Sequence, residues 1–328
     1  MKRILLIIAV ALLAATPAAA EEWKNLAQLP QPQCEAATAV LDGKIYVLGG
    51  WTTNSNETWA AVQIYDPASD TWSAGPAMPV GVNHAGAAVV GGKLYVVGGF
   101  LGPFRQREPT ANVWAFDPAA KKWEAKAPLP APRGAMVVGA IGDKIYAAGG
   151  ERRRPFGEAV PAGAAPAYLP VADVAVYDAK SDKWQVLPPM KVARDHAMGG
   201  VIDGKLLVVG GRDRPRYDLT AVEIFDPASG TWSDGAPIPT GRSGGNAAAL
   251  GGVLYVFGGE GNKANPLGIY TETEGYDLVK NGWTRLKPMS NPRHSLSAAT
   301  VGDRIYLPGG APRAGGDVVT DLLDSFKP

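Results

Sequence analysis

The sequence contains a single cysteine, Cys34, among its 328 residues. One cysteine cannot form an intramolecular disulfide, so the fold must be stabilised by its hydrophobic core. Histidine is also scarce: His84, His196 and His294 are the complete set, and they show no His-x-His or His-x₃-His spacing. Zinc sites usually place ligands at such close spacings. We therefore expect no metal site and no other cofactor.

An excess of charge of one sign is also missing. The chain has 32 basic and 31 acidic residues, a formal net charge of +1. Nucleic-acid partners require a clustered positive excess, so we expect none. No segment after the first fifteen residues has the length and hydrophobicity of a membrane span, so we expect no membrane insertion after signal cleavage.

The only long apolar run lies at the N-terminus. Lys2 and Arg3 precede the run Ile4–Ala15, and Ala18–Ala20 end the segment. A basic start, a short apolar stretch and an A-x-A end are typical of a cleaved secretory signal. The pattern predicts that residues 1–20 are removed before Glu21, which places the mature protein in the periplasm or outside the cell.

Glycine and proline are abundant, at 41 and 28 residues, and they follow a period. Six Gly-Gly pairs each lie 26 residues after a tryptophan. The tryptophans are Trp23, Trp72, Trp123, Trp184, Trp232 and Trp283, and the pairs begin at Gly49, Gly98, Gly149, Gly210, Gly258 and Gly309. Such a repeat indicates a chain built from copies of one supersecondary unit.

Each repeat contains two hairpins. A tight turn such as Asp42-Gly43 joins strands a and b, and an aromatic residue seven positions before the next tryptophan marks strands c and d. Four antiparallel strands in each of six repeats predict an all-β, six-bladed β-propeller. We expect one domain over residues 21–328, with blades at about 33–79, 82–130, 133–190, 194–239, 242–289, and 293–328 plus 21–30.

The last repeat ends at Phe326 and lacks its own tryptophan, whereas Trp23 precedes the first complete repeat. We expect the N-terminal strand to complete the last blade. This closure pairs both chain ends and leaves no exposed sheet edge at the seam.

These repeats resemble the Kelch repeat, which has a Gly-Gly pair, a following Tyr/Phe-Asp-Pro and a spaced tryptophan. The resemblance covers residues 21–328, and the chain looks like the exported bacterial Kelch proteins. More distantly, the chain resembles the periplasmic sialic-acid mutarotases, which are also six-bladed. Kelch propellers include adaptors, glycan-binding modules and enzymes, so the resemblance implies a fold rather than one activity.

The b–c and d–a connections should emerge on one face, and the b–c loops vary most in length, so we expect ligands there. Ten residues after four of the tryptophans stands an arginine, and the histidines follow one or two positions later. We expect these side chains to ring the channel mouth as ligand-binding residues: Arg133, Arg194, Arg242, Arg293, His84, His196 and His294. Guanidinium groups suit carboxylate or phosphate ligands, but each could equally lock neighbouring blades together.

Three charged residues directly follow glycine pairs: Glu151, Arg212 and Glu260. Arg212 joins the predicted ligand-binding set. The first functional interpretation is a binding or interaction module for a carbohydrate, an acidic ligand or a protein. The alternative is a sugar-acid mutarotase or epimerase, with Glu260, Glu151 and His196 as catalytic candidates. The mutarotase pattern has an arginine six residues after its glutamate, whereas Gly157 and Pro266 stand there in this chain.

Overall fold

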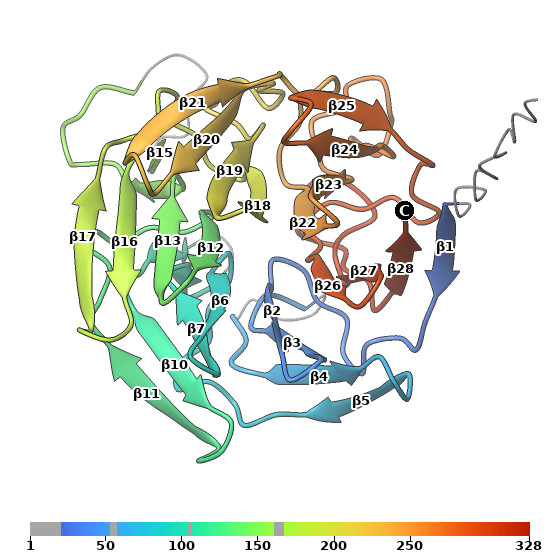
Figure 1. Ribbon diagram of the computed structural model, residues 1–328, viewed down its shortest axis with the longest axis horizontal. Helices are drawn as coiled ribbons and strands as arrows, with labels where there is room; N and C mark the ends of the chain where they lie inside the picture. Colours follow the sequence, from blue (N-terminus) through green and yellow to red (C-terminus); the bar gives the residue numbers. More distant parts are fainter. Residues whose placement is uncertain (1–20, 53–57, 104–105, 161–166) are drawn as a thin grey trace, which may run out of the picture.

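The computed structural model describes residues 21–52, 58–103, 106–160 and 167–328. The predicted signal segment, residues 1–20, lies outside the described residues. Six four-stranded antiparallel sheets surround a central axis (Figure 1). The predicted all-β, six-bladed propeller is confirmed. No helix in the described part of the chain is long and apolar enough to cross a membrane.

Each blade runs outward from strand a to strand d. The innermost strands are β2 (Ala37–Leu41), β6 (Gly86–Val90), β12 (Val137–Ile141), β18 (Met198–Ile202), β22 (Asn246–Leu250) and β26 (Ala299–Val301). The b strands are β3 (Lys44–Leu48), β7 (Lys93–Val97), β13 (Lys144–Ala148), β19 (Lys205–Val209), β23 (Val253–Phe257) and β27 (Arg304–Pro308).

The outer half of each blade is equally regular. The c strands are β4 (Val62–Asp66), β10 (Val113–Asp117), β16 (Val174–Asp178), β20 (Val222–Asp226), β24 (Thr273–Asp277) and β28 (Leu323–Lys327). The d strands are β5 (Thr71–Ala74), β11 (Lys122–Lys126), β17 (Lys183–Leu187), β21 (Thr231–Gly235), β25 (Gly282–Arg285) and β1 (Glu22–Asn25). Two b–c loops form short extra hairpins, β8 (Phe100–Leu101) with β9 (Glu108–Pro109) and β14 (Glu151–Arg153) with β15 (Tyr168–Pro170).

The innermost strands are rich in alanine and glycine because they converge on the axis. A Cβ atom added to Gly86 in β6 would lie 2.1 Å from a methyl group of Val138 in the neighbouring blade. Larger side chains pack further out, where Phe116 of strand c lies 5.1 Å from Trp123 of strand d, centroid to centroid. Residue size therefore follows distance from the axis.

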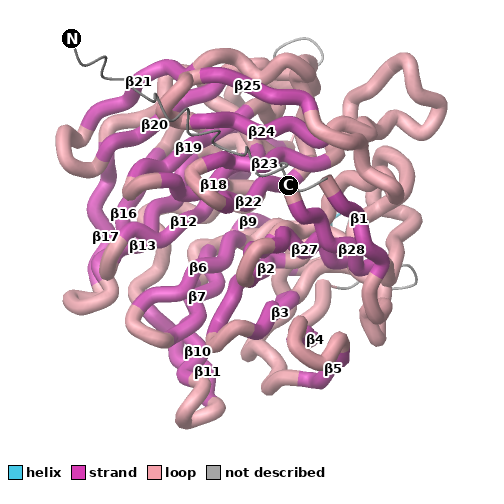
Figure 2. Tube along the Cα trace, turned by 45° about the vertical axis from the view of Figure 1, so that its right-hand side comes forward, coloured by secondary structure: helices cyan, strands magenta, loops and turns pink. Residues whose placement is uncertain are grey.

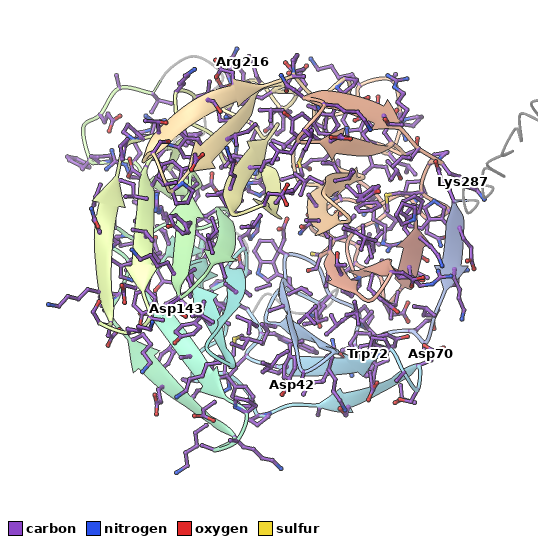
Figure 3. The ribbon with its side chains drawn as sticks, viewed as in Figure 1. Asp42, Asp70, Trp72, Asp143, Arg216 and Lys287 are labelled. Carbon is purple, nitrogen blue, oxygen red and sulfur yellow. The ribbon has the colours of Figure 1, made fainter. Side chains whose placement is uncertain are left out.

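The ring closes between the two ends of the chain. β1 pairs antiparallel with β28, with Trp23 opposite Phe326, as the sequence predicted. The two rings lie 4.8 Å apart, and Trp23 Nε1 donates to the carbonyl of Lys287 at 3.2 Å. Figure 2 shows β1 beside β28 from a second direction, and Figure 3 labels Lys287 next to this seam.

Six residues close a ring of backbone hydrogen bonds around the channel, and we call them the axial ring. Each comes from one blade and donates its N–H to the carbonyl of the axial-ring residue in the preceding blade, at 2.6–3.2 Å. All six have positive φ, between 50° and 64°. They are Glu35, His84, Ala135, His196, Gly244 and Ser295. A left-handed conformation is unfavourable for residues with a side chain, so the closed ring of bonds offsets local strain.

Trp23→Ala should lower the free energy of unfolding by about 3 kcal/mol, the lower end for large aromatic truncations, because Trp23 is half-buried. Trp123→Ala is the matched control, since Trp123 makes the same kind of stacking and Nε1 contact inside an uninterrupted blade. Both should lower the urea midpoint. Only Trp23→Ala should accelerate amide exchange in both β1 and β28, and equal exchange there in the two variants would contradict the closure.

Candidate functional site

Three consecutive residues at the start of each blade have different roles. The first, ten positions after the tryptophan, points into its own blade. The second forms an isolated bridge with the residue that follows the Gly-Gly pair, and the third belongs to the axial ring. The bridges are Cys34–Trp51, Asn83–Phe100, Gly134–Glu151, Asp195–Arg212, Ser243–Glu260 and His294–Ala311. These bridges hold the starts of the b–c loops around the channel.

The four arginines at the first position do not ring the channel mouth, which corrects the expected placement of Arg133, Arg194, Arg242 and Arg293. Each is at most 3% exposed. Arg293 donates to the carbonyls of Gly309 and Leu307 and to the carboxylate of Asp324 at 2.6 Å. In all four blades the guanidinium group donates to the backbone carbonyl of the first glycine of the Gly-Gly pair. They therefore stabilise the corner of their own blade.

The acidic partners of these arginines differ among blades. Arg194 pairs with Glu223 and Arg242 with Glu274, both buried. Arg133 has no carboxylate among its hydrogen-bond partners in the described part of the chain and donates to carbonyls, including that of Asp173 at 2.6 Å. Burial lowers the pKa of Arg133 to about 10, against the raising effect of the Asp173 charge.

A polar pocket of about 300 Å³ lies at the channel mouth, on the face of the b–c and d–a connections, and we call it the mouth pocket. It is lined by Glu35, Trp51, His84, Arg107, His196, Arg212, Arg214, Tyr217, Glu260, His294, Gly315 and Gly316. All three histidines and Arg212 thus lie where the sequence placed them. Smaller spaces of about 90 and 160 Å³ have linings rich in alanine and glycine from the inner strands.

Arg212 is the centre of an ion network in this pocket. Its guanidinium donates to Asp195 at 2.7 Å and to Glu260 at 2.5 Å. Burial alone would raise the pKa of Glu260, but the charges of Arg212 and His294 bring it below its ordinary value. Glu260 is therefore a carboxylate at neutral pH, able to accept hydrogen bonds from a ligand.

His196 is neutral at pH 7 in the folded protein. Burial, followed by the charges of Arg212 and His84, holds the pKa of His196 well below its ordinary value. Its Nδ1 faces Asp195 Oδ1 at 2.5 Å. The third histidine of the pocket, His294, instead directs Nε2 toward the carbonyls of Arg313 and Gly315 at 2.7 and 2.8 Å.

Glu151, one of the catalytic candidates, is fully buried and does not line the mouth pocket. Arg107 covers it, with Nη2 at 2.8 Å from Glu151 Oε1. The Arg107 guanidinium lies over the rings of Phe100 and Tyr168 at 4.8 and 5.1 Å. This contact fastens the second and third b–c loops to each other.

Sequence reasoning missed Glu35, Asp195, Arg107 and Tyr217. The alanine-rich run that begins at Glu35 predicts an inner strand, but the Glu35 side chain lies in the pocket, with Oε1 at 3.2 Å from His84 Nε2. Burial would raise the pKa of Glu35, yet the charge and hydrogen bond of His84, with smaller effects of His196 and Ser295, hold it well below the ordinary value. Its signal was present, since Glu35, His84 and His196 all stand twelve residues after a tryptophan.

Arg242→Ala should lower the free energy of unfolding by about 3–5 kcal/mol, because it leaves Glu274 charged and buried without a partner. Arg285→Ala is the matched control. Arg285 lies 3.8 Å from the same carboxylate, but its side chain is 71% exposed, so its loss should cost less than about 1 kcal/mol. Urea unfolding of both variants tests this, and equal destabilisation would contradict the buried-arginine assignment.

Stability should fall as the pH drops from 7.5 to 5.5, and His196 should contribute to that fall. The unfolded chain protonates this histidine below about pH 6.5, whereas the folded protein keeps it neutral. Acidification therefore favours the unfolded state, by at most about 1.4 kcal/mol per pH unit for this group. Urea midpoints of wild type and His196→Asn should show a smaller pH slope for the variant, and identical slopes would refute the assignment.

Sequence similarity to known proteins extends over nearly all of the propeller. The domain family described as KLHDC2/KLHL20/DRC7 Kelch-repeats matches residues 11–150 and 160–310. Kelch-like protein terF of Aspergillus terreus is 29% identical over 317 residues, covering 93% of this chain and 55% of that protein. Human Kelch-like protein 34 is 28% identical over 251 residues, covering 62% of this chain and 38% of the relative. The chain thus spans about half or less of the length of each of these two relatives.

The solved structure of YjhT superposes on this chain with a TM-score of 0.74. The superposition covers 90% of this chain and 95% of that one, at 20% sequence identity, which supports a likeness of fold. Together with the family match, the blade architecture and the repeated Gly-Gly and tryptophan positions, these findings show that the chain belongs to the Kelch-repeat family.

Proposed function

We propose that this protein is a non-catalytic binding module whose mouth pocket takes a small hydroxylated ligand that carries a carboxylate, such as a sugar acid. Kelch-repeat propellers typically act as protein-interaction modules, and the family assignment supports a binding role. The N-terminal segment with Lys2, Arg3 and an apolar run supports export as part of the proposal.

The main support for the proposal is that Arg214 in the mouth pocket makes no close contact with an acid among the described residues. Its Nη2 lies 3.9 Å from Glu151 Oε2, and its Nε has no hydrogen-bond partner among the described residues. Arg107 and Arg212, by contrast, are held by direct bonds to acids. A buried donor without a partner gains most from an incoming acceptor, and a carboxylate matches the guanidinium fork.

The mouth pocket also presents an aromatic ring. Tyr217 is 39% exposed and lines the pocket, with the guanidinium of Arg212 at 5.3 Å over its ring. A sugar ring can lie on such a face, while the carboxylates of Glu35 and Glu260 accept its hydroxyl protons. The pocket volume of about 300 Å³ suits a ligand of roughly monosaccharide size.

Arg214→Ala should weaken binding of N-acetylneuraminate or a uronic acid by about 10- to 100-fold, because a hydrogen bond to a charged group contributes about 1.5–3 kcal/mol. Arg216→Ala is the matched control from the same loop. Arg216 is paired with Asp213 at the surface, and Figure 3 labels it away from the channel opening. Isothermal titration against a panel of sugar acids and neutral sugars measures the effect. Equal affinities in the two variants would refute the proposed pocket.

A second candidate is a mutarotase for the same ligands, and one observation favours it. Glu35 and Glu260 both face the pocket with an imidazole nearby, at 3.2 Å from His84 and 3.7 Å from His294. Such carboxylate–imidazole pairs can transfer protons to and from an anomeric hydroxyl and a ring oxygen. One-dimensional NMR of anomer exchange decides between the two, because a pure binding module leaves the exchange rate unchanged.

A further inference from the structure

Three side chains of the axial ring meet at one point of the channel although they come from three different blades. The nearest ligand-type atoms of Glu35, His84 and His196 all lie within 4.8 Å of one another. Glu35 Oε1 is 3.2 Å from His84 Nε2, and the two imidazole centroids are 4.9 Å apart. Two imidazoles and one carboxylate form a ligand set that occurs in catalytic zinc and non-haem iron sites.

The hydrogen bonds that orient the two imidazoles from behind are made by Nδ1 in both. His84 Nδ1 lies 2.6 Å from Asn83 Oδ1, and the Asn83 amide nitrogen donates to Thr58 and to the Phe100 carbonyl, which fixes the orientation of the amide. His196 Nδ1 lies 2.5 Å from Asp195 Oδ1. Because both oxygens accept, each Nδ1 can donate to them, and Nε2 is the nitrogen that would bind an ion in place of its present contact with Glu35 or Arg212. Metal-binding histidines are oriented by the same kind of partner.

His294 shows the opposite arrangement and serves as an internal comparison. Its Nε2 points to the carbonyls of Arg313 and Gly315, so that nitrogen carries the hydrogen. Its Nδ1 faces the hydroxyl of Ser295 at 2.6 Å. The imidazole is thus fixed to the b–c loop of the sixth blade. Of the three histidines, only His84 and His196 share the cluster.

Arg212 is the positive charge that a cation would meet. Its Nη2 lies 3.0 Å from both nitrogens of His196. An atom equally distant from both ring nitrogens lies off the in-plane lone-pair axis of each, so the Nε2 lone pair is not blocked. Asp195 and Glu260 bind this guanidinium and offset its charge. Glu35 then remains as the negative charge available to a metal ion.

The backbone holds these three ligands in place before any ion arrives. His84 donates its N–H to the Glu35 carbonyl at 2.9 Å, and His196 donates to Ala135 at 3.2 Å, which in turn donates to His84 at 2.9 Å. One continuous chain of hydrogen bonds therefore connects the three ligand residues. Preorganised ligands reduce the cost of binding.

From this arrangement we propose that Glu35, His84 and His196 bind a divalent transition-metal ion, of the Zn²⁺ class, at the neck of the channel. The remaining coordination positions face the mouth pocket, which all three residues line. The metal site would be a second function beside the proposed ligand binding, and it does not depend on that ligand binding. It also departs from the expectation of no metal drawn from sequence spacing, which considers neighbours along the chain and not across blades.

The test uses the full mature chain without a histidine tag, stripped with a chelator and titrated with Co²⁺ or Zn²⁺. Wild type should bind one ion per chain, and the Co²⁺ form should show the visible absorption of a four- or five-coordinate site. Glu35→Gln and His84→Gln should each weaken binding by more than about a hundredfold, since even partners behind the ligands cost about 10- to 100-fold. His294→Gln is the matched control and should bind as wild type does.

X-ray absorption of the wild-type Zn²⁺ complex provides a readout that does not depend on variant folding, and it should count two imidazole ligands. No saturable uptake by wild type at about 1 mM metal would overturn the proposal. Binding that is lost in His294→Gln but kept in Glu35→Gln would also overturn it. Failure of sugar-acid binding would leave this site standing, because its readout is the metal alone.

Discussion

The hydrogen bonds of the axial ring join all six blades at the channel. Six N–H groups and six carbonyls from six blades form one closed cycle around the channel. Closure requires every contributing residue to adopt positive φ, including five that carry a side chain. A single open blade would leave an unpaired donor and an unpaired acceptor at the axis, in a buried setting where each is costly. The cycle therefore couples the blades to one another.

The other features of the propeller support this cycle. The buried arginines fix the corner at which each blade approaches the axis, and the second glycine of each Gly-Gly pair donates its N–H to the residue two positions before the next axial-ring residue. β1 completes the sixth blade from the opposite end of the chain, so that the sheet of the last blade is as wide as the others. Small residues in the inner strands keep the axis accessible. The residues of the same cycle also place the side chains of Glu35, His84 and His196 in the mouth pocket.

The blade count and the closure were predictable because they depend on spacing along the chain. A tryptophan and a Gly-Gly pair recur at a constant distance, and Trp23 fills the place that is missing after Phe326. The direction of side chains at the start of each blade was not predictable in the same way. The arginines were expected at the channel mouth, but the left-handed residue two positions later, such as His196 after Arg194, turns its own side chain there instead. Left-handed φ at glutamate, alanine and serine has no compositional signal. Contacts across blades, such as Glu35 with His84, also required the structure.

Hydrogen exchange at the six axial-ring amides measures whether the closed cycle opens only with the whole propeller. The N–H groups of Glu35, His84, Ala135, His196, Gly244 and Ser295 should exchange only when the whole propeller unfolds, because each is bonded within one closed cycle. Their opening free energies should therefore be equal to one another and to the global free energy of unfolding. Rapid exchange at one or more of these amides, with the b strands still protected, would show that the cycle does not couple the blades.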